Sequence, residues 1–135
     1  MMKNYFRSCL LVFGLFSCSS YLYGQSELKS LQQVQFLSQS ECIVVQVNAD
    51  WNAKASLDLG DLDNCRWFNA SIDNKEYGNI IASEWKIRSV PTIIMFEYGK
   101  EIKRFEAGLS FQLDKSEIVE KINREIDEIM LRRFQ

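Results

Sequence analysis

Apolar residues recur along this chain at two spacings, one typical of helices and the other of strands. Where they return every fourth residue, as at Tyr77, Ile81 and Trp85, they predict one face of a helix. Where they run on without a break, as in CIVVQVNA (42–49), they predict a strand that is buried on both faces. On this basis we expect helices near residues 27–38, 52–64, 74–86 and 114–134, and strands at 42–49, 65–72, 91–97 and 101–107.

The order of these elements predicts a single α/β domain. Strands that are joined through helices are expected to run parallel, because right-handed crossovers connect them. The strands at 91–97 and 101–107 are joined by the short turn YGK (98–100) and should form an antiparallel hairpin. The predicted architecture is therefore a three-layer α/β/α sandwich with a central four-stranded mixed sheet.

The last helix is the most clearly marked element. Asp114 can cap its N-terminus, and Glu117 stands three residues further on, in the capping-box position. A helix from Asp114 to Phe134 would be about 30 Å long, which is more than one small sheet covers. Its end, which carries Ile129, Met130 and Phe134, is either a frayed terminus or a surface that docks a partner or a second copy of the chain.

Residues 1–24 have the order of a secretory signal, in which two basic residues precede the apolar run CLLVFGLF (9–16) and small polar residues follow it. We expect cleavage after Gly24, which leaves one domain over residues 25–135. The protein is then exported, most simply to a bacterial periplasm. The alternative is a lipoprotein anchored to the membrane through Cys18, since LFSC resembles a lipobox.

Charge and composition exclude several classes of function. The part after residue 24 keeps all 18 acidic residues and 14 of the 16 basic ones, so its formal charge is 14 − 18 = −4 and it offers no basic field to nucleic acid. The chain has no histidine, which excludes Ser-His-Asp and Cys-His catalysis and any zinc site that needs imidazole. We expect no metal and no cofactor, and we interpret Asp50, Asp58, Asp61 and Asp63 as a solvated acidic rim.

Two cysteines, Cys42 and Cys65, remain outside the predicted signal, and each opens a predicted strand. In an exported protein an even pair suggests a disulfide. A bridge that closes a loop of about 23 residues would contribute roughly 3 kcal/mol by chain entropy. The alternative is a pair of buried free thiols that act as small hydrophobic side chains.

The only proline, Pro91, stands at the head of a predicted buried strand, where it removes a donor from the ladder. Such a position often holds a cis peptide bond in a tight turn. Taken by itself, the position is equally compatible with a trans proline that opens the strand.

Three segments around these positions resemble the thioredoxin family. VVQVNADW (44–51) is similar to the strand and tryptophan that lead into a thioredoxin active site. KIRSVPTIIMFEYGKEIKRFEAGLS (86–110) is similar to the segment that holds the family's cis-proline and last hairpin, and NASIDNKEY (69–77) to another strand end with the helix after it. The resemblance covers roughly residues 27–130 and implies a thioredoxin-like fold.

The resemblance is to a branch that lacks the CxxC active site. Where a thioredoxin has Cys-Gly-Pro-Cys after its tryptophan, this chain has Asn52, Ala53, Lys54 and Ala55. We expect Asn52 to cap the helix that follows, since asparagine is a good N-cap and cannot attack a disulfide. Gln46 stands where the family often has a buried aspartate, and a hydrogen-bonded amide can be buried at less cost than a charge. No catalytic residue is expected.

The resemblance implies a peptide-binding groove formed by Trp51, Asn52, Val90 and Pro91. We therefore predict a non-catalytic peptide- or protein-binding or accessory module of the cell envelope. For Trp51 the alternative is a packing role in which it covers Pro91 and closes the end of the sheet. Two other functions stay open: a thiol-disulfide oxidoreductase that works through Cys42 and Cys65, and a structural subunit, such as a homodimer, assembled through the C-terminal helix.

Overall fold

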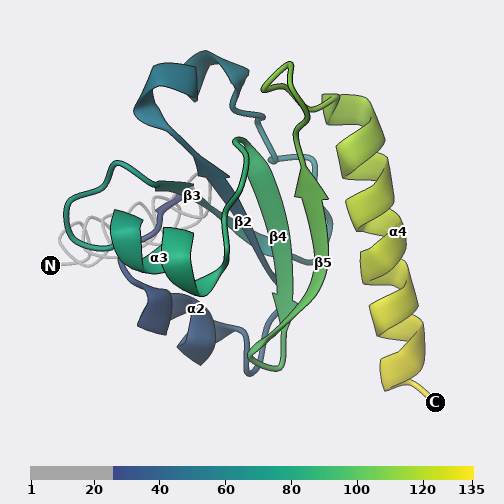
Figure 1. The fold of residues 1–135 in the computed structure, drawn as a ribbon. Coiled ribbons are helices and arrows are strands. Elements are labelled where there is room, and N and C mark those ends of the chain that lie inside the picture. The colour runs from purple at the N-terminus through teal and green to yellow at the C-terminus, as the bar shows by residue number, and fades with distance from the viewer. Residues whose placement is uncertain (1–25) are drawn as a thin grey trace, which may run out of the picture.

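A mixed sheet of five strands lies at the centre of the structure, and helices cover both of its faces (Figure 1). The computed structural model describes residues 26–135, so the predicted signal segment lies outside the described residues. The strands follow the order β1-β3-β2-β4-β5 across the sheet. Their bounds are Ser26–Glu27 for β1, Ile43–Asn48 for β2, Arg66–Ser71 for β3, Thr92–Glu97 for β4 and Lys100–Glu106 for β5.

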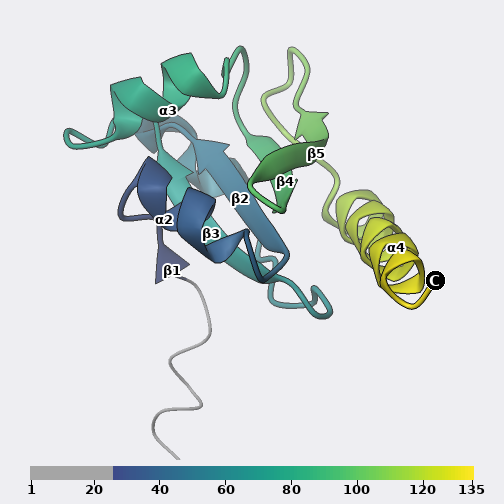
Figure 2. The same cartoon turned by 90° about the horizontal axis from the view of Figure 1, so that it is seen from below.

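This architecture confirms the predicted fold class and adds one strand to the predicted sheet. The extra strand is β1, which has two residues and pairs in parallel with Phe68 and Asn69 at the edge of the sheet (Figure 2). Two residues cannot show a hydrophobic period, so the sequence pattern gave no signal for this strand.

The predicted direction of β4 is wrong. β3 runs parallel to β2 as expected, and β5 runs antiparallel to β4, but β4 pairs with β2 in antiparallel register. The reason is that the connection through α3 (Gly78–Glu84) starts and finishes at the same end of the sheet. β3 ends at Ser71, and Thr92 at the start of β4 pairs with Val47 near the end of β2. A crossover would have required the chain to return to the other end before β4 began.

The other two α-helices are α2 (Leu31–Leu37) and α4 (Lys115–Arg133). The backbone N–H of Gln33 donates to the Ser30 hydroxyl oxygen at 3.2 Å, which fixes the start of α2 four residues later than predicted. The predicted cap of α4 is confirmed, because the Glu117 N–H donates to the Asp114 carboxylate at 2.9 Å. No helix among residues 26–135 is long and apolar enough to span a membrane.

The helix predicted at 52–64 is not formed. A short 3₁₀ helix, η2 (Asp50–Ala55), takes its place, and an irregular segment leads from it to β3. Side chains bind the backbone that a helix would have used: Gln46 holds both the N–H and the C=O of Leu57, at 2.8 and 2.9 Å, and the Asp58 carboxylate accepts the Gly60 N–H at 2.9 Å. The tertiary bonds from Gln46 and the local bond at Asp58 both compete with helix formation, and glycine weakens a helix further.

The two faces of the sheet carry separate apolar layers, because alternate residues of β2 point to opposite faces. Val45 packs with Phe68 and with Ile81 of α3, whereas Val44 packs with Trp67 and with the helix α4. α4 lies on one side of the sheet, and α2 and α3 lie on the other (Figure 2). The buried residues of α4 are Ile118, Ile122, Ile126 and Ile129, and each contributes about 1.5–3 kcal/mol when fully buried.

Candidate functional site

The predicted site lies at the end of the sheet where β2 ends and β4 begins. Because Val47 pairs with Thr92 in antiparallel register, the segment that follows β2 comes beside the segment that precedes β4. The first segment is η2, which contains Trp51 and Asn52. The second contains the Val90–Pro91 peptide bond, which is cis, as the resemblance to the thioredoxin family implies. The topology therefore brings together residues that are 38 positions apart.

Asn52 connects three segments through its side-chain amide. Its Nδ2 donates to the Asn48 Oδ1 at 3.1 Å, to the Phe111 carbonyl at 3.1 Å and, over a longer 3.5 Å, to the Val90 carbonyl. The amide has two hydrogens, so the three acceptors share them. The prediction that Asn52 caps a helix is wrong: the N-cap of η2 is Ala49, without a side-chain bond, and Asn52 lies at a kink inside η2.

Asn48, the last residue of β2, holds Asn52 in place through its side chain. The sequence pattern did not identify this residue. Its side chain is 6% exposed and forms a compact polar network at the end of β2. The amide nitrogen donates to the Asn52 carbonyl at 2.9 Å and to the Ser56 hydroxyl at 2.7 Å, and Oδ1 accepts the Ala49 N–H at 2.9 Å. The one signal in the sequence was the position of this asparagine at the end of a buried apolar strand. A buried amide needs hydrogen-bond partners, so this position indicates a polar network nearby.

An exposed apolar patch lies beside the Asn52 contact. Trp51 is 67% exposed, and its ring meets the Phe111 ring edge to face, with centroids 5.2 Å apart. Leu109, on the same loop between β5 and α4, is 97% exposed. These three residues are called the apolar patch below. Leu109 and Phe111 were missed by the sequence analysis; they are apolar residues in the loop GLSFQ (108–112) that belong to no helix or strand period.

Val90 and Pro91 are both buried residues, and they meet the rest of the site through the Val90 carbonyl. The Val90 carbonyl accepts the long bond from Asn52. No hydrogen bond from the Val90 N–H is found within the part of the chain that the structure describes. The structure therefore joins the four predicted residues at one edge, with Trp51 as the exposed member and Asn52 as the link to the proline segment.

Gln46 lies in β2, two residues before Asn48, and is 1% exposed. Besides its two bonds to Leu57, its Nε2 donates to the Asn69 Oδ1 at 3.0 Å. The buried amide is thus satisfied without a charge, as expected for this position. Residues 52 and 55 are asparagine and alanine, so neither carries a thiol. No group of three His, Cys, Asp or Glu residues that could hold a metal ion occurs in residues 26–135.

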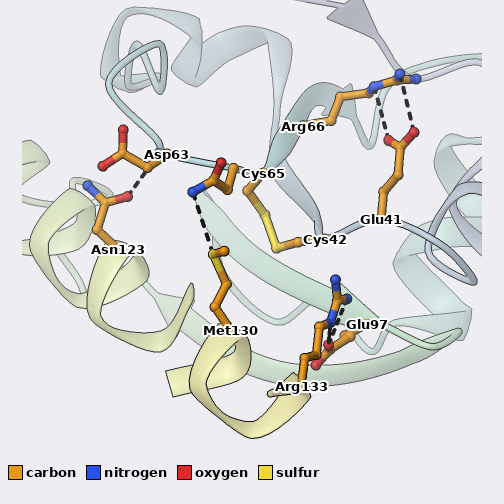
Figure 3. Close-up of a disulfide and its surroundings, with 10 residues drawn as sticks. Glu41, Cys42, Asp63, Cys65, Arg66, Glu97, Asn123, Met130 and Arg133 are labelled. Carbon is orange, nitrogen blue, oxygen red and sulfur yellow. Dashed lines mark hydrogen bonds and ion pairs between the residues drawn. A yellow bond between two sulfur atoms is a disulfide. The ribbon is translucent and has the colours of Figure 1, made fainter. Parts of the chain in front are cut away.

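The cysteines lie at the other end of the sheet. Cys42 and Cys65 form a disulfide, as one of the two alternatives predicted, and they immediately precede β2 and β3 (Figure 3). The length of β2 separates them from the Trp51 edge, which amounts to about 20 Å for six residues. A cavity of about 420 Å³ between the disulfide and the end of α4 is bordered by Arg66, Arg133 and Met130.

Two ion pairs flank the disulfide in Figure 3. Arg66 pairs with Glu41 at 3.3 Å, and Arg133 pairs with Glu97 at 2.9 Å. The second pair attaches the end of α4 to β4, so the helix remains on the sheet to its last turn. The disulfide end is therefore cross-linked and carries two ion pairs, and it too exposes apolar side chains, Leu131 and Phe134 of the last turn of α4 and its cap.

No protein-family model matches the chain, and no curated protein sequence matches it either. Solved structures of thioredoxins are similar to it in fold. The thioredoxin of Schistosoma mansoni matches with a TM-score of 0.60 and 15% identity, over 76% of this chain and 95% of that one. A mutant thioredoxin from Halobacterium salinarum matches with a TM-score of 0.57 and 16% identity, over 74% and 87%.

A third similar structure is thioredoxin O2 from Arabidopsis thaliana, with a TM-score of 0.55 and 18% identity, over 76% of this chain and 94% of that one. Identities this low establish the fold and carry no activity from one protein to another. The chain thus has a thioredoxin-like fold, and its function has to be argued from its own residues.

Proposed function

We propose that this protein is a non-catalytic binding module, which holds a segment of a peptide or protein partner against the edge formed by Trp51, Asn52, Val90 and Pro91. The observation that carries the proposal is the apolar patch. Large apolar side chains that stay exposed together are typical of interaction sites. Aromatic residues are also enriched in such sites, because they supply a large contact area.

The backbone beside the patch supports an extended partner. Val90 lies just before β4, and its N–H has no partner within the described residues. An extended segment can accept such a hydrogen bond while it places alternate side chains on the neighbouring surface. The Val90 carbonyl already accepts a hydrogen bond from Asn52, so it is less available to a partner. Most of the binding free energy would therefore come from the apolar patch.

Ordinary thiol-disulfide exchange at this edge is not part of the proposal. The exchange begins with a thiolate, and the residues after Trp51 supply an amide and a methyl group in its place. The disulfide that the chain does have lies at the opposite end of β2. We assign the module to the cell envelope on the signal-like order of residues 1–24.

Site-specific crosslinking in the native cells tests the proposal. With p-benzoylphenylalanine in place of Leu109, irradiation should give a discrete adduct, which the additional change Trp51→Ala should largely remove. The matched control carries the photoreactive residue in place of Glu128, an exposed position on α4, and should give no such adduct. An adduct that forms equally well without Trp51, or from position 128 alone, would contradict the assignment.

A further inference from the structure

The outer face of α4 is a second surface on which large apolar side chains are exposed close together. No element among the described residues covers this side of the helix (Figures 1 and 2). Leu131 is 66% exposed, and Phe134, the C-cap of the helix, is 85% exposed. The isoleucine stripe of α4 already holds the helix on the sheet, so these two side chains are not needed for that contact.

The charged residues of α4 differ between its two halves. The first half contains two ion pairs between residues four positions apart, Glu117–Lys121 and Glu120–Arg124. Glu128 and Arg132 have the same spacing near the end of the helix, but neither side chain forms an ion pair or a hydrogen bond within the described residues. Two opposite charges without partners therefore lie beside the exposed Leu131.

The spacing of these two charges suits a second copy of the chain. Glu128 stands two residues before Met130 and Arg132 two residues after it, and both lie on the same side of Leu131 on the helix surface. A two-fold axis near Met130 that sets two α4 helices antiparallel places Glu128 of each copy opposite Arg132 of the other. It also brings the two Leu131 side chains together, so one patch serves both copies, as a two-fold interface requires.

We infer that this protein forms a homodimer through the end of α4, in which Leu131 and Phe134 pack between the copies and Glu128 of each copy pairs with Arg132 of the other. The Trp51 edge stays open in this dimer. The end of α4 is attached to Glu97 at the end of β4, whereas the Trp51 edge lies where β4 begins.

Charge favours a second copy over a lipid surface as the occupant. Asp127, Glu128 and Arg132 give this face two acidic residues and one basic residue, whereas anionic lipids attract clusters of basic residues. Arg133 does not change this balance, because it is paired with Glu97 at 2.9 Å. The chain itself supplies the complementary charge at the required distance.

The contact between the two copies is small. The stretch from Asp127 to Phe134 extends over about 12 Å of helix. Specific interfaces of such limited extent are typical of transient complexes. We therefore expect the protein to exchange between monomer and dimer instead of forming a permanent dimer.

Sedimentation equilibrium of the chain 25–135 tests the inference. Between about 10 µM and 1 mM, the mass of the wild type should rise from that of one chain toward that of two. Leu131→Asp should keep the mass of one chain throughout, and circular dichroism verifies that this variant, which changes an exposed position, is folded.

Charge reversal tests the ion pairs. Glu128→Arg and Arg132→Glu, each alone, should weaken the association roughly tenfold, because each places like charges opposite one another at both ends of the interface. The variant with both changes should recover most of the wild-type affinity, because the pairs form again with reversed sign. The matched control is Arg124→Glu, which lies on the same helix outside the stretch 127–134 and should leave the association unchanged.

A single-chain mass over the whole range, or a double reversal as weak as either single change, would overturn the inference. Binding to phosphatidylglycerol vesicles in the absence of any dimer would assign the face to a lipid surface instead. In crosslinked cells, position 128 should give a self-adduct of twice the mass of the chain, which differs from the partner adduct at position 109. Trp51→Ala should dimerise like the wild type, so the inference and the proposed function fail independently.

Discussion

Asn52 holds the predicted site together through its side-chain amide, which bonds to three separate segments. One side-chain amide reaches β2 through Asn48, the proline segment through Val90 and the loop after β5 through Phe111. The contact with the Phe111 carbonyl also holds the loop between β5 and α4, and the ring of Phe111 meets the ring of Trp51. The residue is therefore a positioning residue for the apolar patch.

Removing this amide should loosen the edge measurably. For Asn52→Ala we expect the free energy of unfolding to fall by about 1–2 kcal/mol, because the carbonyls of Val90 and Phe111 lose their donor. Urea unfolding of the chain 25–135 measures this change. Asn79→Ala, on the exposed side of α3, is the matched control and should cost nothing measurable. Equal midpoints for wild type and Asn52→Ala would contradict the role that we assign to Asn52.

At this scale the sequence predicted residues that do lie close together in the structure, and it gave one of them, Asn52, the wrong partners. Asn52 was expected to bond within its own helix, because capping depends only on local sequence. Its actual acceptors include Val90 and Phe111, 38 and 59 residues away, and their positions depend on the complete sheet. Phe111 was missed for the same reason, since nothing local marks a loop residue as the neighbour of Trp51.

At the scale of elements, the irregular segment between η2 and β3 replaces a helix and depends on anchors at both of its ends. Gln46 binds Leu57 near its start, and the disulfide between Cys42 and Cys65 holds its end. Leu59 between them is fully buried and packs in the layer under α4. The segment is ordered by these contacts in place of the hydrogen bonds of a regular helix.

The disulfide should therefore matter for stability more than for chemistry. For the double variant Cys42→Ala, Cys65→Ala we expect the free energy of unfolding to fall by about 3 kcal/mol, the entropy of closing a loop of this length in the unfolded chain. Urea unfolding with and without a reducing agent measures it: reduction should weaken the wild type and leave the variant unchanged. A wild type that is insensitive to reduction would contradict the structural role.

The start of α4 should respond to pH through Asp114. The pKa of this carboxyl is lowered, first by the hydrogen bond from the Glu117 N–H and then by the Ser116 hydroxyl. A lowered pKa in the folded state gives stability above the unfolded value, and this stability is lost as pH falls through the folded value.

Asp114→Asn keeps the cap oxygen and removes this titration. Between about pH 6 and pH 3 the urea midpoint of the wild type should fall by more than that of the variant. Asp127→Asn, which removes an exposed carboxylate from the same helix, serves as the control. Parallel pH profiles for the wild type and Asp114→Asn would show that the cap contributes nothing that depends on pH.

Elements with a strong period were predictable, and elements that depend on distant contacts were not. α4 has both a cap signal and a buried isoleucine stripe, and it begins where expected. The residues from 52 to 64 also place Ala55, Leu59 and Leu62 at helical spacing, yet tertiary bonds from Gln46 and the turn at Asp58 override that period. Periodicity alone cannot show this, because Gln46 lies in another element.

At the scale of the whole molecule, the sheet separates two ends with different properties. One end has the disulfide and two ion pairs, and the other has the apolar patch and the Asn52 contacts. The fold class followed from the order of strands and helices, but the direction of β4 did not, because it depends on whether the chain crosses the sheet between β3 and β4. That direction places Val90 beside Asn52 and so creates the site.

A molecule of this design should not catalyse disulfide reduction. In the insulin-reduction assay with dithiothreitol, we expect the chain 25–135 to give no acceleration above the protein-free rate, because its thiols are paired at the end remote from Trp51. A thioredoxin serves as the positive control. Turnover that is present in the wild type and lost in Cys42→Ala, Cys65→Ala would show instead that the disulfide is a redox site.

Backbone amide chemical shifts of the ¹⁵N-labelled chain 25–135, titrated with a synthetic peptide from the partner segment that crosslinks at position 109, test the central claim most directly. If the Trp51 edge is a binding surface, the changes should be concentrated in residues 49–56, 88–92 and 107–112, and Trp51→Ala should abolish them. Shift changes centred instead on Cys42, Cys65 and the last turn of α4, and unaffected by Trp51→Ala, would contradict the account.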